Sequence, residues 1–254
     1  MIQAKKRFGQ NFLQDEYVIN RIVELINPVW DDFMIEIGPG LGALTKPILY
    51  HLDHLHVIEI DFDIIAYLKK IYTNKEITIH QGDALKFDYK FNELYNTAPQ
   101  IRVVGNLPYN ISTPLLFYLA KFDNIIDMHF MLQKEVVERI CAKPNCNNYG
   151  RLSVMLQYRF NCLNLLHVAP ESFYPRPKVE SAIVRLIPKK EHPIIDEKKL
   201  NHIVTNAFNK RRKAISNSLK NIISMESFER LGIEPNLRAE NLTVEQFIQL
   251  SQII

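Results

Sequence analysis

The sequence has 254 residues, 47% of them hydrophobic and 23% charged, and a formal net charge of only +3. This composition is that of an ordinary globular protein, and no apolar run approaches the roughly 18 residues that span a bilayer, so we expect no membrane contact. The three cysteines are too sparse for a metal site and suit a reducing compartment. The first seven residues are basic without a following apolar segment, so we expect no secretory signal and a cytoplasmic location.

Hydrophobic periodicity gives alternating strand and helix patterns up to residue 188 and helix patterns alone after residue 194. The predicted strands are 33–37, 55–60, 77–80, 101–105, 128–132 and 181–187. The predicted helices are 17–26, 44–52, 113–122, 134–140, 200–208, 214–223 and 244–253. This order predicts an α/β domain of residues 1–188 with a parallel, doubly wound sheet, followed by a small all-helical domain of residues 194–254.

Residues 8–13, Phe-Gly-Gln-Asn-Phe-Leu, precede every predicted element and follow three cations. Phe8, Phe12 and Leu13 are costly to leave in water, so we expect this segment to fold over another part of the protein. A frayed basic tail is the alternative, because chain termini are often disordered.

The strand 33–37 runs directly into a turn that contains Gly38 and Gly40, and a helix pattern follows. This combination is typical of a nucleotide-binding site, because glycines let the backbone approach a ligand closely. Gly38, Gly40 and Ala43 also fit the dinucleotide fingerprint, so NAD is a competing ligand. Glu36 favours a cationic ligand, such as a sulfonium amino acid, over a pyrophosphate.

Acidic residues stand at the ends of the next two predicted strands. Glu59 lies about 20 residues after the glycine turn, where a carboxylate accepts a hydrogen bond from a ribose hydroxyl. Asp61 and Asp63 follow it and are candidate helix caps. Asp83 either accepts a hydrogen bond from the adenine amine of a cofactor or is an ordinary turn residue. Because ligands of parallel sheets bind beyond the carboxyl ends of the strands, these positions together predict one ligand site.

The strand 101–105 is followed by Asn106-Leu107-Pro108-Tyr109, which we interpret as a methyl-transfer site for an exocyclic amine. The lone pair of an adenine amine is delocalised into the ring, so the nitrogen must become more tetrahedral before it attacks. The side-chain oxygen of Asn106 and the carbonyl of Leu107 can each accept one amine hydrogen. Tyr109 offers a face for the base to stack on, a contact of roughly 1–3 kcal/mol. An ordinary strand and Asn-Pro turn is the alternative.

A proline-rich loop, residues 170–179, contains the aromatic residue that we expect on the other face of the target base. Its three prolines reduce the freedom of the chain, which suits an aromatic held at the mouth of a pocket. Phe173 is the candidate to enclose the base opposite Tyr109. A residue that simply covers the edge of the sheet is an equally good interpretation of Phe173.

The C-terminal helical region carries four consecutive cations, Lys210, Arg211, Arg212 and Lys213. We expect them at the start of a helix, where cations oppose the helix dipole, so their presence indicates a function such as phosphate contact. A solvated charged face is the alternative.

Four motifs in this order closely resemble those of the KsgA (RsmA) family of ribosomal RNA adenine dimethyltransferases. The motifs are Phe8-Gly9-Gln10-Asn11-Phe12-Leu13, Glu36-Ile37-Gly38-Pro39-Gly40, Asn106-Leu107-Pro108-Tyr109 and Phe173-Tyr174-Pro175-Arg176-Pro177-Lys178-Val179-Glu180-Ser181-Ala182. The resemblance covers nearly the full length, including the run Asn209 to Lys213.

The resemblance implies a Rossmann-like methyltransferase sheet that uses S-adenosylmethionine as methyl donor and no metal. The expected substrate is 16S rRNA within the immature small ribosomal subunit, where two adjacent adenosines near the 3′ end each receive two methyl groups on N6. The residues implied to contact the donor are Asn11, Leu13, Gly38, Glu59, Asp83 and Asn106. The residues implied to position the target adenine are Asn106, Leu107, Tyr109 and Phe173. We expect a monomer whose cations Lys210, Arg211, Arg212 and Lys213 contact the RNA.

Three alternatives remain open at this stage. An Erm-like enzyme would methylate one adenine of large-subunit RNA with similar catalytic motifs. A non-catalytic ribosome-assembly factor would use the same fold only to bind RNA. An NAD-dependent enzyme is compatible with the glycine spacing alone.

Overall fold

A computed structural model describes residues 5, 9–91, 99–191 and 193–254. They form two compact units, the first made of Met1–Val137 and Leu163–Pro188, the second of Glu138–Cys162 and Lys189–Ile254. The boundaries that we expected, 1–188 and 194–254, therefore miss one feature. Residues 138–162 pack with the C-terminal helices because Tyr149, Val154 and Tyr158 share a buried apolar cluster with them.

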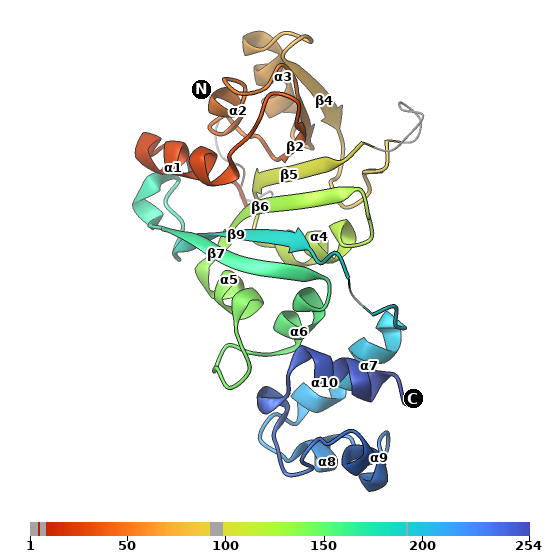
Figure 1. Cartoon of the computed structure of the whole chain (residues 1–254). Helices are drawn as coiled ribbons and strands as arrows, with labels where there is room; N and C mark the ends of the chain where they lie inside the picture. Colours follow the sequence, from red (N-terminus) through yellow and green to blue (C-terminus); the bar gives the residue numbers. More distant parts are fainter. Residues whose placement is uncertain (1–4, 6–8, 92–98, 192) are drawn as a thin grey trace. The chain divides into compact units, whose positions relative to one another are not determined.

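The largest element of the fold is a seven-stranded sheet with the order β4-β3-β2-β5-β6-β9-β7 (Figure 1). The strands are β2 (Phe33–Ile37), β3 (Leu55–Glu59), β4 (Ile77–Gln81), β5 (Ile101–Asn106), β6 (Ile125–Gln133), β7 (Phe160–Val168) and β9 (Ser181–Pro188). Strands β2 to β6 pair in parallel, and β9 pairs antiparallel to β6. The expected α/β sheet is thus confirmed, with an antiparallel edge added to it.

The helices are α1 (Glu16–Ile26), α2 (Thr45–Ile48), α3 (Phe62–Ile71), α4 (Ser112–Leu119), α5 (Lys134–Cys141), α6 (Arg151–Gln157), α7 (Glu197–Asn209), α8 (Ile215–Ser218), α9 (Met225–Arg230) and α10 (Val244–Ser251). Aspartate side chains cap several of them, as Asp15 does for α1 and Asp61 for α3. The expected helix 44–52 is wrong in extent, since only Thr45–Ile48 is α-helical and the following residues form shorter turns.

Two sets of strands were not expected from the sequence. β7 was missed because its exposed asparagines interrupt any apolar alternation, which an edge strand tolerates. β1 (Phe12–Leu13) and β8 (Phe173–Tyr174) form a separate two-stranded sheet, in which Phe12 faces Tyr174 and Leu13 faces Phe173. Long-range pairs of two residues each leave no periodic signal in a sequence.

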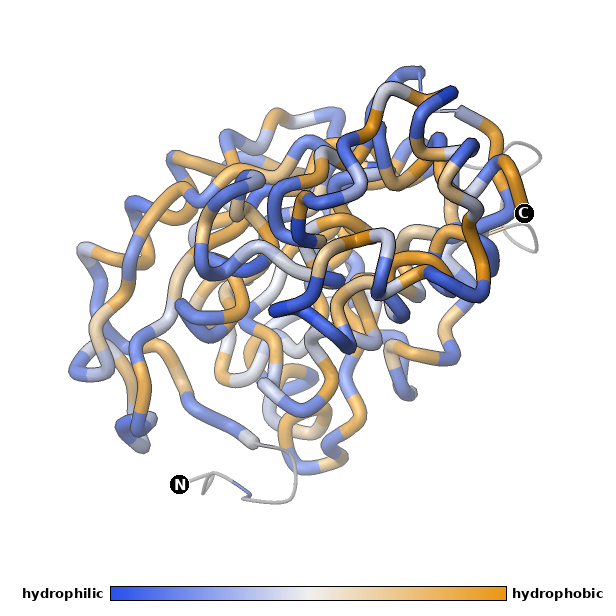
Figure 2. Tube along the Cα trace, turned by 90° about the horizontal axis from the view of Figure 1, so that it is seen from below, coloured by the Kyte–Doolittle hydropathy of each residue, from blue (hydrophilic) through white to orange (hydrophobic). Residues whose placement is uncertain are grey.

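The central strands explain why the first unit folds. β2, β3 and β5 are buried along almost their whole length, as is typical of parallel strands covered on both faces. Each fully buried Ile, Val or Leu side chain contributes about 1.5–3 kcal/mol relative to exposure. Figure 2 shows apolar and polar residues interleaved along the trace. No helix in the described part of the chain is long and apolar enough to cross a membrane.

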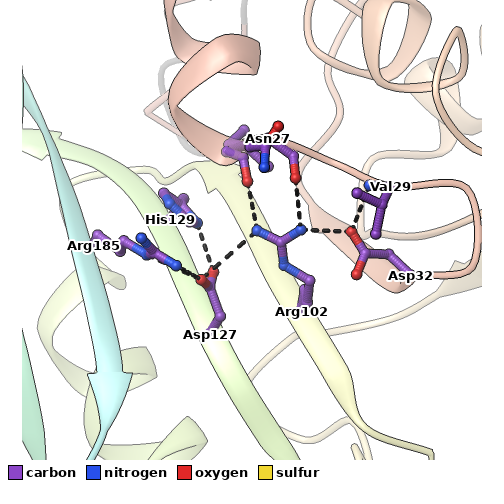
Figure 3. A network of polar contacts seen from close by, with 8 residues as sticks. Asn27, Val29, Asp32, Arg102, Asp127, His129 and Arg185 are labelled. Atoms are coloured by element: carbon purple, nitrogen blue, oxygen red, sulfur yellow. Dashed lines mark hydrogen bonds and ion pairs between the residues drawn. The ribbon is translucent and has the colours of Figure 1, made fainter.

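Buried charges fix the amino end of β5 to its neighbours (Figure 3). The Arg102 guanidinium donates to the carbonyl of Asn27 at 3.1 Å and to Asp32 at 2.5 Å. Asp127 on β6 accepts from Arg185 at 2.7 Å and lies 2.7 Å from His129. Burial alone would raise the pKa of Asp127, but the contacts with His129, Arg185 and Arg102 outweigh burial and hold it below its usual value.

Candidate active site

A cavity of about 310 Å³ lies at the carboxyl ends of the parallel strands. Five segments supply most of its lining: residues 9–13, the glycine turn after β2, the residues at the ends of β3 and of β4 that include Glu59 and Asp83, and residues 106–111 at the end of β5. This is the edge at which a parallel sheet binds ligands. The expected meeting of these segments in one site is therefore what the fold produces.

The glycine turn has a backbone that other residues rarely adopt. Gly38 and Gly40 have φ angles of +67° and +55°. A Cβ added at Gly40 would lie 3.2 Å from the Phe12 ring, which packs against the turn. In the neighbouring strand, a Cβ on Gly105 would lie 2.5 Å from the carbonyl oxygen of Ile37. Small residues thus allow three chain segments to converge behind the cavity.

Two buried carboxyl groups dominate the electrostatics of the cavity. Glu36 is 2% exposed and accepts a hydrogen bond from the Thr45 hydroxyl at 2.6 Å. Burial, together with the negative charge of Glu59, raises the pKa of Glu36 to about 7. Burial also raises the pKa of Glu59, although the backbone amides of Ile60 and Asp61 each donate to one of its oxygens at 2.8 Å.

Asp83 adds a third carboxylate to the lining, and no lysine or arginine is among the lining residues that the structure describes. One Asp83 oxygen accepts from the amide of Leu85 at 2.9 Å, so this residue also forms the turn that was its alternative interpretation. Three acids without a cation suit a positively charged ligand and oppose a pyrophosphate.

The Asn106 side chain is held in one orientation. Its Nδ2 donates to the backbone carbonyl of Asn11 at 3.0 Å. No hydrogen bond to the Oδ1 atom of the same amide is found among the residues that the structure describes, so this oxygen can accept one from a ligand. Leu107 is buried, and its amide donates to the carbonyl of Met131 at 3.2 Å. Both contacts fix the turn that carries the Asn106 side chain and the Leu107 carbonyl.

Tyr109 closes the same end of the cavity. Its hydroxyl lies 3.2 Å from the Ser181 hydroxyl of β9, and its carbonyl accepts from the Ser112 hydroxyl at 3.1 Å. Tyr109 is therefore held both at its side-chain hydroxyl and at its backbone carbonyl. The sequence gives no sign of this Ser181 contact, because it joins residues 72 positions apart.

The structure brings together eight of the nine residues proposed from the sequence. Those that line the cavity are Asn11, Leu13, Gly38, Glu59, Asp83, Asn106, Leu107 and Tyr109. Phe173 does not line it: the side chain is 5% exposed and belongs to the apolar core, opposite Leu13. An apolar ring is stabilised by such burial, and the stacking role expected for Phe173 stays a prediction. Phe8 lies outside the described residues.

The basic run lies in a different setting from the expected one. α7 ends at Asn209 and α8 begins at Ile215, so the four cations follow the carboxyl end of a helix, where the dipole favours them. The run also directly precedes the four-residue helix α8, so the expected opposition to a dipole concerns α8 alone. All four residues are exposed, but Arg211 pairs with Glu240 at 2.7 Å and donates to the carbonyl of Asn147 at 2.6 Å.

A comparison with protein-family models decides the family. The model described as ribosomal RNA adenine dimethylase matches residues 1–254. The chain belongs to the ribosomal RNA adenine dimethylase family. Membership in this methyltransferase family, which uses S-adenosylmethionine, removes NAD as the competing ligand of the glycine turn.

Curated members of the ribosomal RNA adenine dimethylase family are similar over almost the whole chain. Ribosomal RNA small subunit methyltransferase A of Chromobacterium violaceum is 56% identical over 97% of this chain and 94% of its own length. The protein of the same name from Nitrosospira multiformis is 52% identical over 97% of this chain and 95% of its own length.

Solved structures agree on the fold of this family. A dimethyladenosine transferase from Plasmodium falciparum matches with a TM-score of 0.80 at 25% identity, over 94% of this chain and 95% of its own. The 23S rRNA methyltransferase ErmE matches with a TM-score of 0.75 at 23% identity, over 95% of this chain and 98% of its own. At that identity, the likeness to ErmE concerns the fold alone.

Proposed function

We propose that this protein uses S-adenosylmethionine to dimethylate the N6 amines of two adjacent adenosines near the 3′ end of 16S rRNA in the small ribosomal subunit. One observation carries the proposal: among the described residues that line the cavity there are three acidic side chains and no lysine or arginine, together with an asparagine whose oxygen can accept an amine hydrogen. The similarity to proteins named ribosomal RNA small subunit methyltransferase A supports the choice of subunit.

The acidic cavity fits the donor, which carries a sulfonium and an ammonium group. We assign donor contacts to Asn11, Leu13, Gly38, Glu59, Asp83 and Asn106, all of which line the cavity. Glu59 accepts from the backbone amides of Ile60 and Asp61 at one oxygen and also interacts with the Gly40 amide. A carboxylate has about four lone-pair sites, so it can still accept from a ribose hydroxyl. When bound, S-adenosylmethionine supplies an electrophilic methyl group.

Asn106 at the end of β5 and Leu107 after it activate the amine that receives the methyl group. The Oδ1 of Asn106 and the carbonyl of Leu107 accept the two amine hydrogens, which localises the nitrogen lone pair and directs it at the methyl carbon. A nitrogen–carbon bond then forms as the sulfur–carbon bond breaks, and the electron pair of that bond remains on sulfur. The product ammonium loses its proton to water, so the main contribution of the protein is positioning.

Tyr109 offers one face for the flipped or unpaired adenine. Phe173 stays a prediction as the other face, since its ring would have to leave the core beside Leu13 to reach the base. Phe173→Leu keeps an apolar side chain there, while Phe173→Ala leaves a cavity. If only packing matters, the leucine variant should methylate at the wild-type rate per folded molecule; a large loss in both variants supports stacking.

We also propose that the exposed cations Lys210, Arg212 and Lys213 contact RNA phosphates, with Arg211 partly engaged by Glu240. Arg212→Ala should weaken binding to small subunits and lower the slope of log affinity against log salt by about 1. An unchanged slope would contradict phosphate contact. The monomeric state stays a prediction that light scattering after size-exclusion chromatography tests.

The deciding experiment is transfer of labelled methyl groups from S-adenosylmethionine to small subunits that lack this modification. Digestion of the RNA should release dimethyladenosine from two adjacent positions near the 3′ end. Isolated large-subunit RNA is the parallel substrate. Preferential methylation of that RNA would overturn the choice of substrate in favour of an Erm-like activity, and RNA binding without any transfer would favour an assembly factor.

A further inference from the structure

Residues 9–13 cross one side of the cavity and are anchored at both ends. At one end, Phe12 and Leu13 pair with the strand Phe173–Tyr174. At the other end, the Gln10 side chain forms a bridge: its Nε2 donates to Asp61 Oδ2 at 3.0 Å, and its Oε1 accepts from the backbone amide of Lys5 at 2.8 Å. Both hydrogen-bonding atoms of the Gln10 amide are thus used to hold the segment.

Asp61 is the fixed end of this bridge. It is 1% exposed, its backbone follows β3, and its Oδ1 caps α3 by accepting from the amide of Asp63 at 3.0 Å. Lys5 Nζ lies 2.5 Å from the same oxygen. Asp61 is not among the described residues that line the cavity, so it touches neither of the proposed substrates.

The bridge lies one residue from the group that orients Asn106. The carbonyl of Asn11, next to Gln10, accepts from Asn106 Nδ2 at 3.0 Å. If this carbonyl moved away, the Asn106 amide could rotate. Its NH₂ group, which can only donate hydrogen bonds, would then face the amine of the target base. An acceptor at that position is what the proposed chemistry needs.

We propose that Gln10 and Asp61 are positioning residues, which hold residues 9–13 over the bound donor and, through the Asn11 carbonyl, keep Asn106 Oδ1 directed at the target amine. The inference rests on the function proposed above. In this inference the same short segment, residues 9–13, retains the methyl donor and also orients Asn106 Oδ1, which accepts a hydrogen bond from the target amine.

The chain offers an isosteric exchange to test this bridge. Asp61→Asn keeps an oxygen to cap α3 but turns an NH₂ group toward the NH₂ group of Gln10. Gln10→Glu sets two carboxylates against each other. In the double variant Gln10→Glu/Asp61→Asn, the amide NH₂ introduced at position 61 can donate to the carboxylate introduced at position 10, so the hydrogen bond is restored with its direction reversed. Asp63→Asn is the matched control, since Asp63 contacts Lys5 but is largely exposed and takes no part in the bridge.

We expect each single variant to bind S-adenosylmethionine several-fold more weakly in calorimetry and to lose about tenfold or more in kcat at saturating donor, per folded molecule. The double variant should recover to within about threefold of wild type in both measurements. Asp63→Asn should resemble wild type.

Three results would overturn the inference: single variants with wild-type donor affinity and kcat, a double variant no better than the single ones, or a change only in melting temperature. Calorimetry with S-adenosylmethionine needs no RNA. Its outcome therefore decides the donor-retaining role of the bridge even if wild-type protein fails to methylate small subunits, which would count against the proposed function instead.

Discussion

The polar groups around the two ends of β5 differ in how their charges are balanced. Arg102 and Asn106 lie four residues apart on one face of the strand. At the Arg102 end, Asp32 and Asp127 both contact arginine (Figure 3). At the Asn106 end, Glu36 and Glu59 lie side by side without a cation among the described lining residues.

The presence or absence of an opposite charge distinguishes polar groups that serve the structure from polar groups that suit a ligand. Taking a charge out of water is costly unless an opposite charge or hydrogen bonds compensate it. The Arg102 end compensates its charges within the protein, so it stabilises the fold. At the Asn106 end, Glu36 and Glu59 have hydrogen bonds but no opposite charge among the described lining residues, which favours a cationic ligand. Burial and the charge of Glu59 raise the pKa of Glu36.

Removing the acceptor at the ligand end should have the largest effect. Asn106→Ala should reduce methylation on the order of 10³-fold or abolish it, because one preorganised hydrogen-bonding group at a reacting atom contributes about 3–4 kcal/mol. Binding to small subunits should remain nearly unchanged, since the side chain contacts no phosphate in the proposed complex. Methyl transfer and subunit binding would be measured on the same preparation. A variant with a near wild-type rate would refute the proposed role of Asn106.

Removing the arginine at the paired end should act on stability instead. Arg102→Met leaves Asp32 and two backbone carbonyls without their donor, and it should lower the free energy of unfolding by about 3–5 kcal/mol. Arg185→Met is the matched control with a smaller expected loss, because Arg185 is more exposed. Urea unfolding measures both, and kcat per folded molecule should stay the same. A specific loss of kcat in Arg102→Met would break the contrast between the two ends.

The two ends should also respond to pH with opposite signs. The pKa of Glu36 is raised to about 7, so its contribution to the stability of the ligand-free protein is fully present below its ordinary pKa and is lost as pH rises through about 7. The pKa of Asp127 is lowered, so its contribution is lost only as pH falls through that lowered pKa.

Glu36→Gln isolates the first of these effects, because glutamine can still accept from Thr45. It should stabilise the ligand-free protein above pH 7 by up to about 3 kcal/mol. In wild type, affinity for cationic S-adenosylmethionine should rise with pH through about 7, and in the variant that rise should vanish. Thermal unfolding and calorimetry between pH 5.5 and about 8.5 test both statements. A pH-independent wild type would show that Glu36 does not titrate in this range.

The smallest expected effect concerns the tether of Tyr109. Ser181→Ala removes the hydroxyl 3.2 Å from that of Tyr109 and should lower kcat about three- to tenfold, in line with the ~1 kcal/mol of an ordinary hydrogen bond. Ser181→Thr retains a hydroxyl and should recover part of the rate. Steady-state kinetics on small subunits gives the comparison. Equal rates in all three proteins would mean that Tyr109 is placed by packing alone.

Much of this site can be predicted from local sequence. A strand followed by Gly38 and Gly40, and another followed by Asn106, identify the ligand edge of a parallel sheet, because turn chemistry and apolar runs are local properties. The order of motifs gave the family, which the match over residues 1–254 confirms. The expected cap at Asp61 is likewise a local feature.

Other features depend on contacts between distant residues, so only the tertiary structure decided them. Gln10 reaches Asp61 across 51 positions, and Asn106 reaches Asn11 across 95. Phe173 packs in the core and not in the cavity, and residues 138–162 pack with the C-terminal helices. In both cases apolar side chains are buried against partners that only the folded chain brings close. Spacing in a sequence carries no information on such partners, since they meet only once the chain has folded.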